Sequence, residues 1–225
     1  MNEALPVSIF LITKNESDRL GATLRAIGGL SDDVIVVDSG STDGTVELAR
    51  SLGARVIHNP WTGYGPQKRF GEDQCRHDWV LNLDADEVMP PELVAEIRDV
   101  FAQGRHRAAD GFLIRFAEVF PGEARPHPWA YSHAYIRLYR RSRGRFAASP
   151  VHDAVAMEPG ARLERLRGIV HHFSVRSLGD QLAKLNRYSD QQAEDLDARG
   201  VVLPTWRVFG ELPAAFLKAY LGRRH

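Results

Sequence analysis

The sequence predicts an α/β fold, with a mostly parallel, doubly wound sheet that carries helices on both faces. Two observations support this prediction: short apolar runs alternate with helical stretches in the first half, and polar clusters follow the ends of those runs. Strands that are apolar along their whole length are typical of a parallel sheet covered on both faces. The expected strands of this half are residues 7–13, 34–38, 55–58 and 79–83.

Helices are expected between these strands. Residues 17–27 repeat leucine and isoleucine every three or four positions behind Ser17, which is a good N-cap residue. Asp43 is predicted as the N-cap of a second helix, which Gly53 ends. A further helix over residues 90–101 follows the fourth strand.

The second half changes to strands without long helices, expected at 111–120, 135–140 and 168–173, and a helix is predicted over 177–198. The predicted organisation is an α/β half over 1–105, a mixed β half of the same domain over 106–176 and a C-terminal helical region over 177–225.

Composition limits the classes of partner and the compartment. The chain has 225 residues with 29 Lys+Arg and 29 Asp+Glu, so no overall charge attracts nucleic acid, and no nucleic-acid partner is expected. Cys75 is the single cysteine and the N-terminus lacks a signal-peptide pattern, which predicts a cytoplasmic protein. The aromatic and cationic residues of 201–225 fit either an interfacial helix, on the inner face of the cytoplasmic membrane, or packing against protein.

Carboxylates follow two of the expected strands. Asp84 and Asp86 come after the fourth strand, and their oxygens suit Mg²⁺ or Mn²⁺. The alternative for Asp86 is a charge that stabilises the start of the helix over 90–101. Asp38 ends the second strand, where it could accept hydrogen bonds from a ribose or a base, or open an Asx turn.

The strand ends carry neither a phosphate-binding P-loop nor a dinucleotide fingerprint, which argues against nucleoside-triphosphate hydrolysis and hydride transfer.

Four segments, in their order and spacing, resemble glycosyltransferase family 2 of the GT-A fold. They are ITKNE at 12–16, VVDSGSTDGT at 36–45, QK at 67–68 and WVLNLDADE at 79–87, and the resemblance extends to about residue 100. The resemblance implies a nucleotide-diphosphate sugar donor. It places Thr13, Glu16 and Asp38 around the nucleoside, Lys68 and Asp84 near the donor, and Asp84 and Asp86 around a metal that bridges the diphosphate.

Two further segments resemble the subfamily of bacterial lipopolysaccharide-core glucosyltransferases. Val151-His152-Asp153 is similar to its Val-His-Glu motif, which makes Asp153 the preferred general base and Glu118 the alternative. Asp153 is shorter by one methylene than the glutamate of the motif, and an ion pair with a nearby arginine is its other interpretation. His172 matches the histidine of a His-aromatic-Ser segment, either as a metal or diphosphate ligand or as a hydrogen-bonded residue at a strand end.

Five arginines crowd a short strand-turn-strand that begins with the expected strand 135–140: Arg137, Arg140, Arg141, Arg143 and Arg145. A solvated hairpin is the simplest interpretation, and a surface for an anionic glycolipid or a membrane is the alternative.

The resemblance implies a metal-dependent, inverting glycosyltransferase. Its expected donor is a UDP-hexose, and its expected acceptor is an envelope glycolipid or polysaccharide such as lipopolysaccharide core. Two alternatives stay open at this point: a nucleotidyltransferase, and a non-catalytic protein that binds nucleotide-sugars.

Overall fold

The computed structural model describes residues 3–149 and 154–177, and isolated positions between 179 and 217. The chain divides into two units, one made of Met1–Glu118 with Ser132–His172 and the other of Val119–Tyr131 with Phe173–His225. All described strands belong to the first unit. The predicted base Asp153 lies outside the described residues, as do half of the predicted helix over 177–198 and most of the tail over 201–225. The predicted boundaries at 105 and 176 stay predictions.

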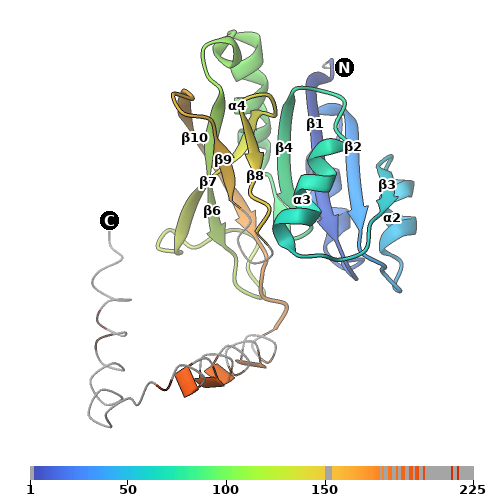
Figure 1. The fold of residues 1–225 in the computed structure, drawn as a ribbon, viewed down its shortest axis with the longest axis vertical. Coiled ribbons are helices and arrows are strands. Elements are labelled where there is room, and N and C mark those ends of the chain that lie inside the picture. The colour runs from blue at the N-terminus through green and yellow to red at the C-terminus, as the bar shows by residue number, and fades with distance from the viewer. Residues whose placement is uncertain are drawn as a thin grey trace. The chain divides into compact units, whose positions relative to one another are not determined.

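The first unit is built on a mixed eight-stranded sheet with the order β3-β2-β1-β4-β7-β6-β10-β5 (Figure 1). The first four strands of this order are parallel, β7 is antiparallel to both β4 and β6, β10 is parallel to β6, and β5 is antiparallel to β10. Strands β8 and β9 form a separate antiparallel pair. The strands are β1 Leu5–Thr13, β2 Ser31–Asp38, β3 Arg55–His58, β4 Trp79–Asp84, β5 Glu87–Val88, β6 Gly111–Glu118, β7 Ser132–Arg140, β8 Gly144–Phe146, β9 Val155–Met157 and β10 Leu163–His172.

Helices pack on both faces of this sheet, so the predicted α/β class is confirmed. Along β1, Ile9 and Leu11 join a core that includes residues of α1 and α4, whereas Phe10 and Ile12 face a second core with Phe146. The described helices are α1 Leu20–Ala26, α2 Thr45–Ser51, α3 Tyr64–Asp73, α4 Pro91–Ala102 and a short 3₁₀ turn, η1, at Arg105–Arg107. Within the described part of the chain, no helix combines the length and the apolar character that crossing a bilayer requires.

Two helix starts differ from the prediction. Helix α1 begins at Leu20 rather than at residue 17, because the preceding residues form a turn in which the Glu16 carbonyl accepts the Leu20 N–H (2.9 Å). Helix α2 begins at Thr45 with Gly44 as its N-cap, one residue after the predicted Asp43. Asp43 still accepts the Thr45 N–H (3.0 Å), and its second oxygen accepts the Ser17 N–H (3.2 Å). Helix α3 lies between β3 and β4, where the alternating pattern predicts a helix without giving its bounds.

The five arginines do not form a solvated hairpin. Strand β8 pairs with β9 and not with β7, and Arg137 is buried, with 6% of its surface exposed. The other four are bound to the fold: Arg140 to the His106 carbonyl, Arg141 to the Glu72 and Cys75 carbonyls, Arg143 to Glu158, and Arg145 to Glu72 and Asp73. The prediction of a solvated hairpin was wrong, because these guanidinium groups satisfy carboxylates and carbonyls of the protein itself.

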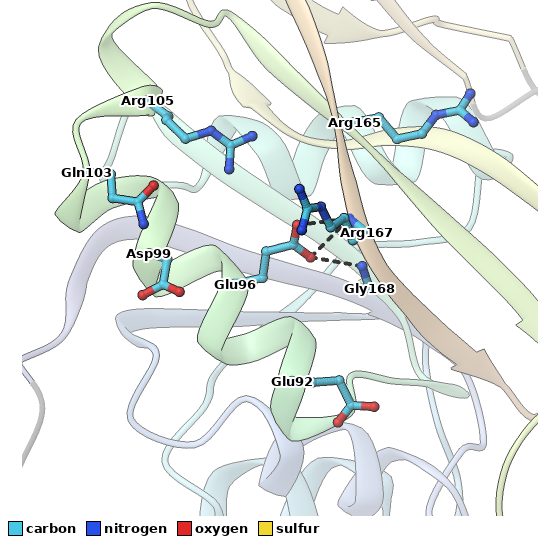
Figure 2. A pocket seen from close by; sticks show the side chains of 8 residues that line it. All are labelled: Glu92, Glu96, Asp99, Gln103, Arg105, Arg165, Arg167 and Gly168. Atoms are coloured by element: carbon cyan, nitrogen blue, oxygen red, sulfur yellow. Dashed lines mark hydrogen bonds between the residues drawn. The ribbon is translucent and has the colours of Figure 1, made fainter.

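A bulge in β10 sets the register at the end of that strand. Three residues of β10, 166–168, lie opposite a single residue of β6, so this stretch of β10 contains two more residues than the paired stretch of β6. Glu96 of α4 holds the bulge by accepting the N–H groups of Arg167 (2.9 Å) and Gly168 (2.8 Å). These residues line a cavity of about 690 Å³ between α4 and β10 (Figure 2). A Cβ at Gly168 would lie 2.8 Å from the Leu93 Cβ, so glycine permits this close approach to α4. Bulges of this kind re-aim side chains farther along a strand.

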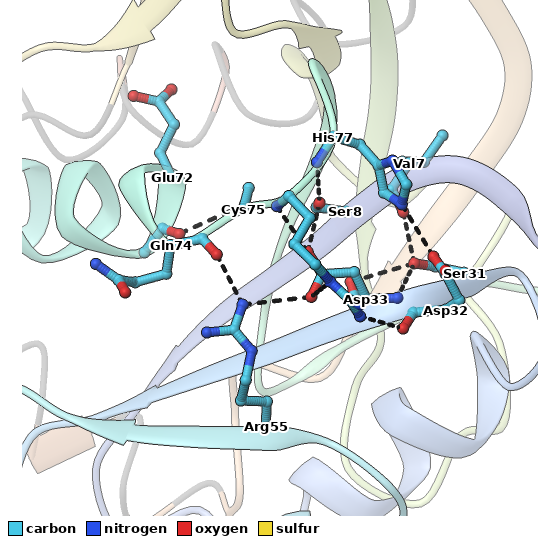
Figure 3. A network of polar contacts seen from close by, with 12 residues as sticks. Val7, Ser8, Ser31, Asp32, Asp33, Arg55, Glu72, Gln74, Cys75 and His77 are labelled. Carbon is cyan, nitrogen blue, oxygen red and sulfur yellow. Dashed lines mark hydrogen bonds and ion pairs between the residues drawn. The ribbon is translucent and has the colours of Figure 1, made fainter.

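A buried carboxylate, Asp33, is the centre of a polar network near the start of β2 (Figure 3). Asp33 is 1% exposed and accepts hydrogen bonds from the Ser8 hydroxyl (2.6 Å) and the Arg76 N–H (2.9 Å), with the Arg55 guanidinium at 3.3 Å. Burial opposes ionisation of Asp33, but these donors outweigh it and lower its pKa. The network therefore ties β1, β2 and β3 together with the turn before β4.

Replacing Asp33 by asparagine is expected to lower the free energy of unfolding by about 2 kcal/mol at neutral pH, because buried donors lose a charged acceptor. The pKa of Asp33 is lower in the folded chain than its ordinary value of 3.8. Its stabilisation is therefore complete above pH 3.8 and is lost as the pH falls through the folded value. Urea unfolding between pH 3 and pH 7 measures this difference. Asp32→Asn, at an exposed neighbour, is the control, and equal stability of the two variants would contradict the prediction.

Candidate functional site

Three strand ends meet at one edge of the sheet. The register places Thr13 of β1 opposite Asp38 of β2, and Ile12 opposite Asp84 of β4. In parallel α/β sheets, ligands bind beyond this carboxyl edge. The predicted polar clusters at the ends of these strands are therefore neighbours.

The loops after β1 and β2 are joined by hydrogen bonds. Asn15 has a left-handed backbone (φ 56°), and its side chain accepts the Thr42 N–H at 2.8 Å. Asp38 is buried and forms an Asx turn, with one oxygen accepting the N–H groups of Gly40 (2.9 Å) and Ser41 (3.0 Å). The Thr13 hydroxyl is 3.5 Å from its other oxygen. The Asx-turn interpretation of Asp38 therefore holds, and its contact with a nucleoside stays a prediction.

Helix α3 delivers two buried polar side chains to this edge. The Gln67 side chain donates to the Ser39 hydroxyl (2.9 Å) and accepts from the Asn59 amide (2.7 Å), so it connects the loops after β2 and β3. The next residue, Lys68, is fully buried, and its Nζ lies 2.9 Å from Asp84 Oδ1. The sequence predicted Lys68 near the donor, and the structure places it beneath the end of β4.

The Asp84 carboxylate lies between two cations. Besides Lys68, the Nη2 of Arg137 is 3.6 Å from Asp84 Oδ2. Burial disfavours the charged form of Asp84, but the positive charges of Lys68 and Arg137 outweigh it and hold its pKa well below the ordinary value. Asp84 is therefore ionised and neutralised by the protein itself.

Sequence reasoning missed the role of Arg137. Its guanidinium also contacts Glu87 (3.2 Å) and the Asn82 side chain, and Glu87 in turn accepts the Asp84 N–H at 2.8 Å. Burial raises the pKa of Glu87 above the ordinary carboxyl range. The available signal was an arginine inside an otherwise apolar stretch of a predicted strand. Such a residue is seldom buried unless it is paired with an acidic group.

Asp86 faces a different set of partners. Its Oδ2 lies 3.0 Å from Arg19, which also forms a two-pronged pair with Glu16 (2.8 Å for each hydrogen bond). Glu16, predicted near the nucleoside, is thus linked through Arg19 to Asp86. Arg19 is a second residue at the site that the sequence analysis did not identify.

His172 connects Asp86 to Glu118. His172 Nε2 is 3.6 Å from Asp86 Oδ1, and His172 Nδ1 is 2.8 Å from Glu118 Oε1. Burial disfavours the imidazolium, but the hydrogen bond to Glu118 and the nearby carboxylates outweigh it and raise the pKa of His172. Three residues predicted from separate parts of the sequence therefore form one cluster.

The donors around Asp86 fit a divalent cation that keeps open positions. Asp86 supplies a carboxylate oxygen and His172 an imidazole nitrogen, and both ligand types suit Mn²⁺, while carboxylate alone suits Mg²⁺. In the part of the chain that the structure describes, no group of three His, Cys, Asp or Glu side chains could enclose a metal. Such a cation would therefore need further ligands from water or substrate. Asp84 fits less well as a ligand, because two cations already neutralise it.

The segment that precedes Asp153 is anchored at the start of α3. The Gly65 N–H donates to the Ser149 carbonyl (3.1 Å), and the Ala147 N–H donates to the Ala154 carbonyl (3.0 Å). A Cβ on Gly65 would lie 2.2 Å from the Ala147 carbonyl oxygen, so only glycine permits this approach. The described residue Ser149 is thus hydrogen-bonded to Gly65, which lies about one helical turn before Lys68.

Comparison with known proteins points to one family. The family model described as glycosyl transferase family 2 matches residues 8–159. The chain belongs to glycosyltransferase family 2. It is 38% identical over 226 residues to an uncharacterized glycosyltransferase of Rickettsia prowazekii, covering 97% of this chain and 77% of that protein. It is 31% identical to the lipopolysaccharide core biosynthesis glycosyltransferase LpsC of Rhizobium meliloti, covering 96% and 81%.

Among solved structures, residues 1–349 of TarS from S. aureus superpose with a TM-score of 0.53 at 18% identity, over 76% of this chain and 61% of that one. This likeness concerns the fold alone. Family membership confirms the prediction of a glycosyltransferase and removes the nucleotidyltransferase alternative.

Gly65→Ala is expected to destabilise the protein by about 3 kcal/mol, because the added Cβ collides with backbone that has little room to move. It is also expected to lower the catalytic rate, by displacing the chain that leads to Asp153. Gly44→Ala is the matched control: nothing lies within 4 Å of its Cβ position, and loss of a glycine N-cap costs about 1 kcal/mol or less. Thermal unfolding and turnover of both variants measure the difference, and equal effects would contradict the anchoring role.

Proposed function

We propose that this glycosyltransferase moves a hexose from a UDP-linked donor to an envelope glycolipid or polysaccharide, such as lipopolysaccharide core, with the help of Mg²⁺ or Mn²⁺. The observation that carries the proposal is the convergence of Asp38, the Lys68–Asp84 pair and the Asp86–His172 pair on one edge of the sheet. The name of the related LpsC supports the acceptor class.

Each part of the edge has a distinct task in this proposal. Thr13, Asp38 and Glu16 lie on the β1 and β2 side and form the nucleoside side of the site. Lys68 and Asp84 support the donor from beneath. Asp86 and His172 would hold the divalent cation, which would neutralise negative charge on the departing diphosphate.

The acceptor hydroxyl must lose its proton as it attacks the anomeric carbon, which requires a base within hydrogen-bond reach. We assign this role to Asp153, with Glu118 as the alternative, on the resemblance of the Val151-His152-Asp153 segment to a family motif. A single displacement with inversion also follows from that resemblance. A glycolipid acceptor would bring the enzyme to the inner face of the cytoplasmic membrane, with the segment over 201–225 as the proposed contact.

The proposal is tested by hydrolysis of UDP-hexoses without acceptor, measured with Mn²⁺ and with a chelator. Wild-type protein is expected to hydrolyse one donor slowly, in a metal-dependent manner. Asp86→Ala is expected to lower that rate about 100-fold, because a ligand of a charge-stabilising cation is lost. The control is Asp99→Ala, on the exposed side of α4, which is expected to behave as wild type. Metal-independent hydrolysis, or equal rates for the two variants, would contradict the proposal.

A further inference from the structure

Glu118 and His172 are paired by the sheet itself. Strands β6 and β10 run parallel, and their register places His172 directly opposite Glu118. Side chains at opposed positions of neighbouring strands lie on the same face of the sheet. The 2.8 Å contact between Glu118 Oε1 and His172 Nδ1 is therefore a product of strand pairing.

This register depends on the bulge at 166–168. Without its two extra residues, Val170 would lie opposite Glu118, and His172 would lie two positions beyond the end of β6. Glu96 and the close packing of Gly168 on α4 stabilise the bulge. The bulge, which lies away from Asp86, therefore shifts the register of β10 so that His172 lies opposite Glu118.

The contact determines which nitrogen of His172 carries a proton. An ionised carboxylate can only accept a hydrogen bond, so the group that faces Glu118 must be Nδ1–H. The neutral ring then has its lone pair on Nε2, the atom that lies 3.6 Å from Asp86 Oδ1. Histidines that bind metals commonly donate their other N–H to a carboxylate in this way.

We propose that Glu118 is a positioning residue, which fixes the ring and the tautomer of His172 so that Nε2 and Asp86 together bind the divalent cation. This inference rests on the metal-dependent function proposed above. It differs from the assignment of Glu118 as an alternative base, because one oxygen of its carboxylate is engaged by the imidazole. Its action on the reaction is through His172.

Mn²⁺ affinity of the full chain in the presence of UDP, measured by electron paramagnetic resonance of free Mn²⁺, tests the proposal without an acceptor. Glu118→Ala is expected to weaken binding 10- to 100-fold, the range found for loss of such partners. Glu118→Gln keeps an oxygen that accepts the Nδ1–H, so its affinity is expected to stay within about threefold of wild type. Glu164→Ala, at the other end of β10, is the control and is expected to bind as wild type.

A double variant tests whether Glu118 acts through His172. His172→Ala is expected to weaken binding, and adding Glu118→Ala to it is expected to have no further effect, because the two residues work as one unit. Circular dichroism and thermal unfolding verify that each variant is folded.

The outcomes distinguish failure of the metal-dependent function from failure of the positioning role of Glu118 alone. If wild-type protein does not bind Mn²⁺, or Asp86→Ala binds it equally well, the metal-dependent function itself is wrong. If Asp86→Ala loses affinity but Glu118→Ala does not, or if Glu118→Gln loses as much as Glu118→Ala, only the positioning role is overturned. Unchanged affinity with abolished transfer in Glu118→Ala would instead identify Glu118 as the base.

Discussion

The site depends on one carboxylate, Asp84, held between two buried cations, Lys68 of α3 and Arg137 of β7. An unpaired cation at that depth would cost several kcal/mol, so the carboxylates beside Lys68 and Arg137 are needed for both cations to stay buried. Lys68 comes from a helix that packs on the parallel half of the sheet, and Arg137 comes from a strand of the mixed half. This group of charges therefore connects the two halves at the end of β4. Asp86 follows two residues after Asp84 in the chain.

Neighbouring charges give the two aspartates of the motif different surroundings. Asp84 is neutralised by protein cations and supports the structure of the site. Asp86 faces Arg19 and His172 at the edge of the sheet, where a cation and a diphosphate could reach it. In the proposed function, Asp84 is a structural anchor and Asp86 is a metal ligand. The difference arises from the neighbours that α3, β7 and β10 bring to each carboxylate.

The sequence was informative where structure is determined locally. Apolar runs located the strands of the first half, and the polar residues that follow them located the carboxyl edge. The bounds of helix α3 were not predicted because Gly65, Pro66 and Gly71 interrupt its pattern, although close packing requires glycine at two of these positions. The partners of Arg137 and of the bulge at 166–168 could not be predicted, since they lie 50 or more residues away along the chain.

The roles of Asp84 and Asp86 are tested most directly by the position of Mn²⁺ in crystals grown with UDP, located by its anomalous scattering. A peak is expected in contact with Asp86 and with Nε2 of His172, while Lys68 remains paired with Asp84. A peak held by Asp84 with Lys68 displaced, or one distant from both Asp86 and His172, would contradict these roles.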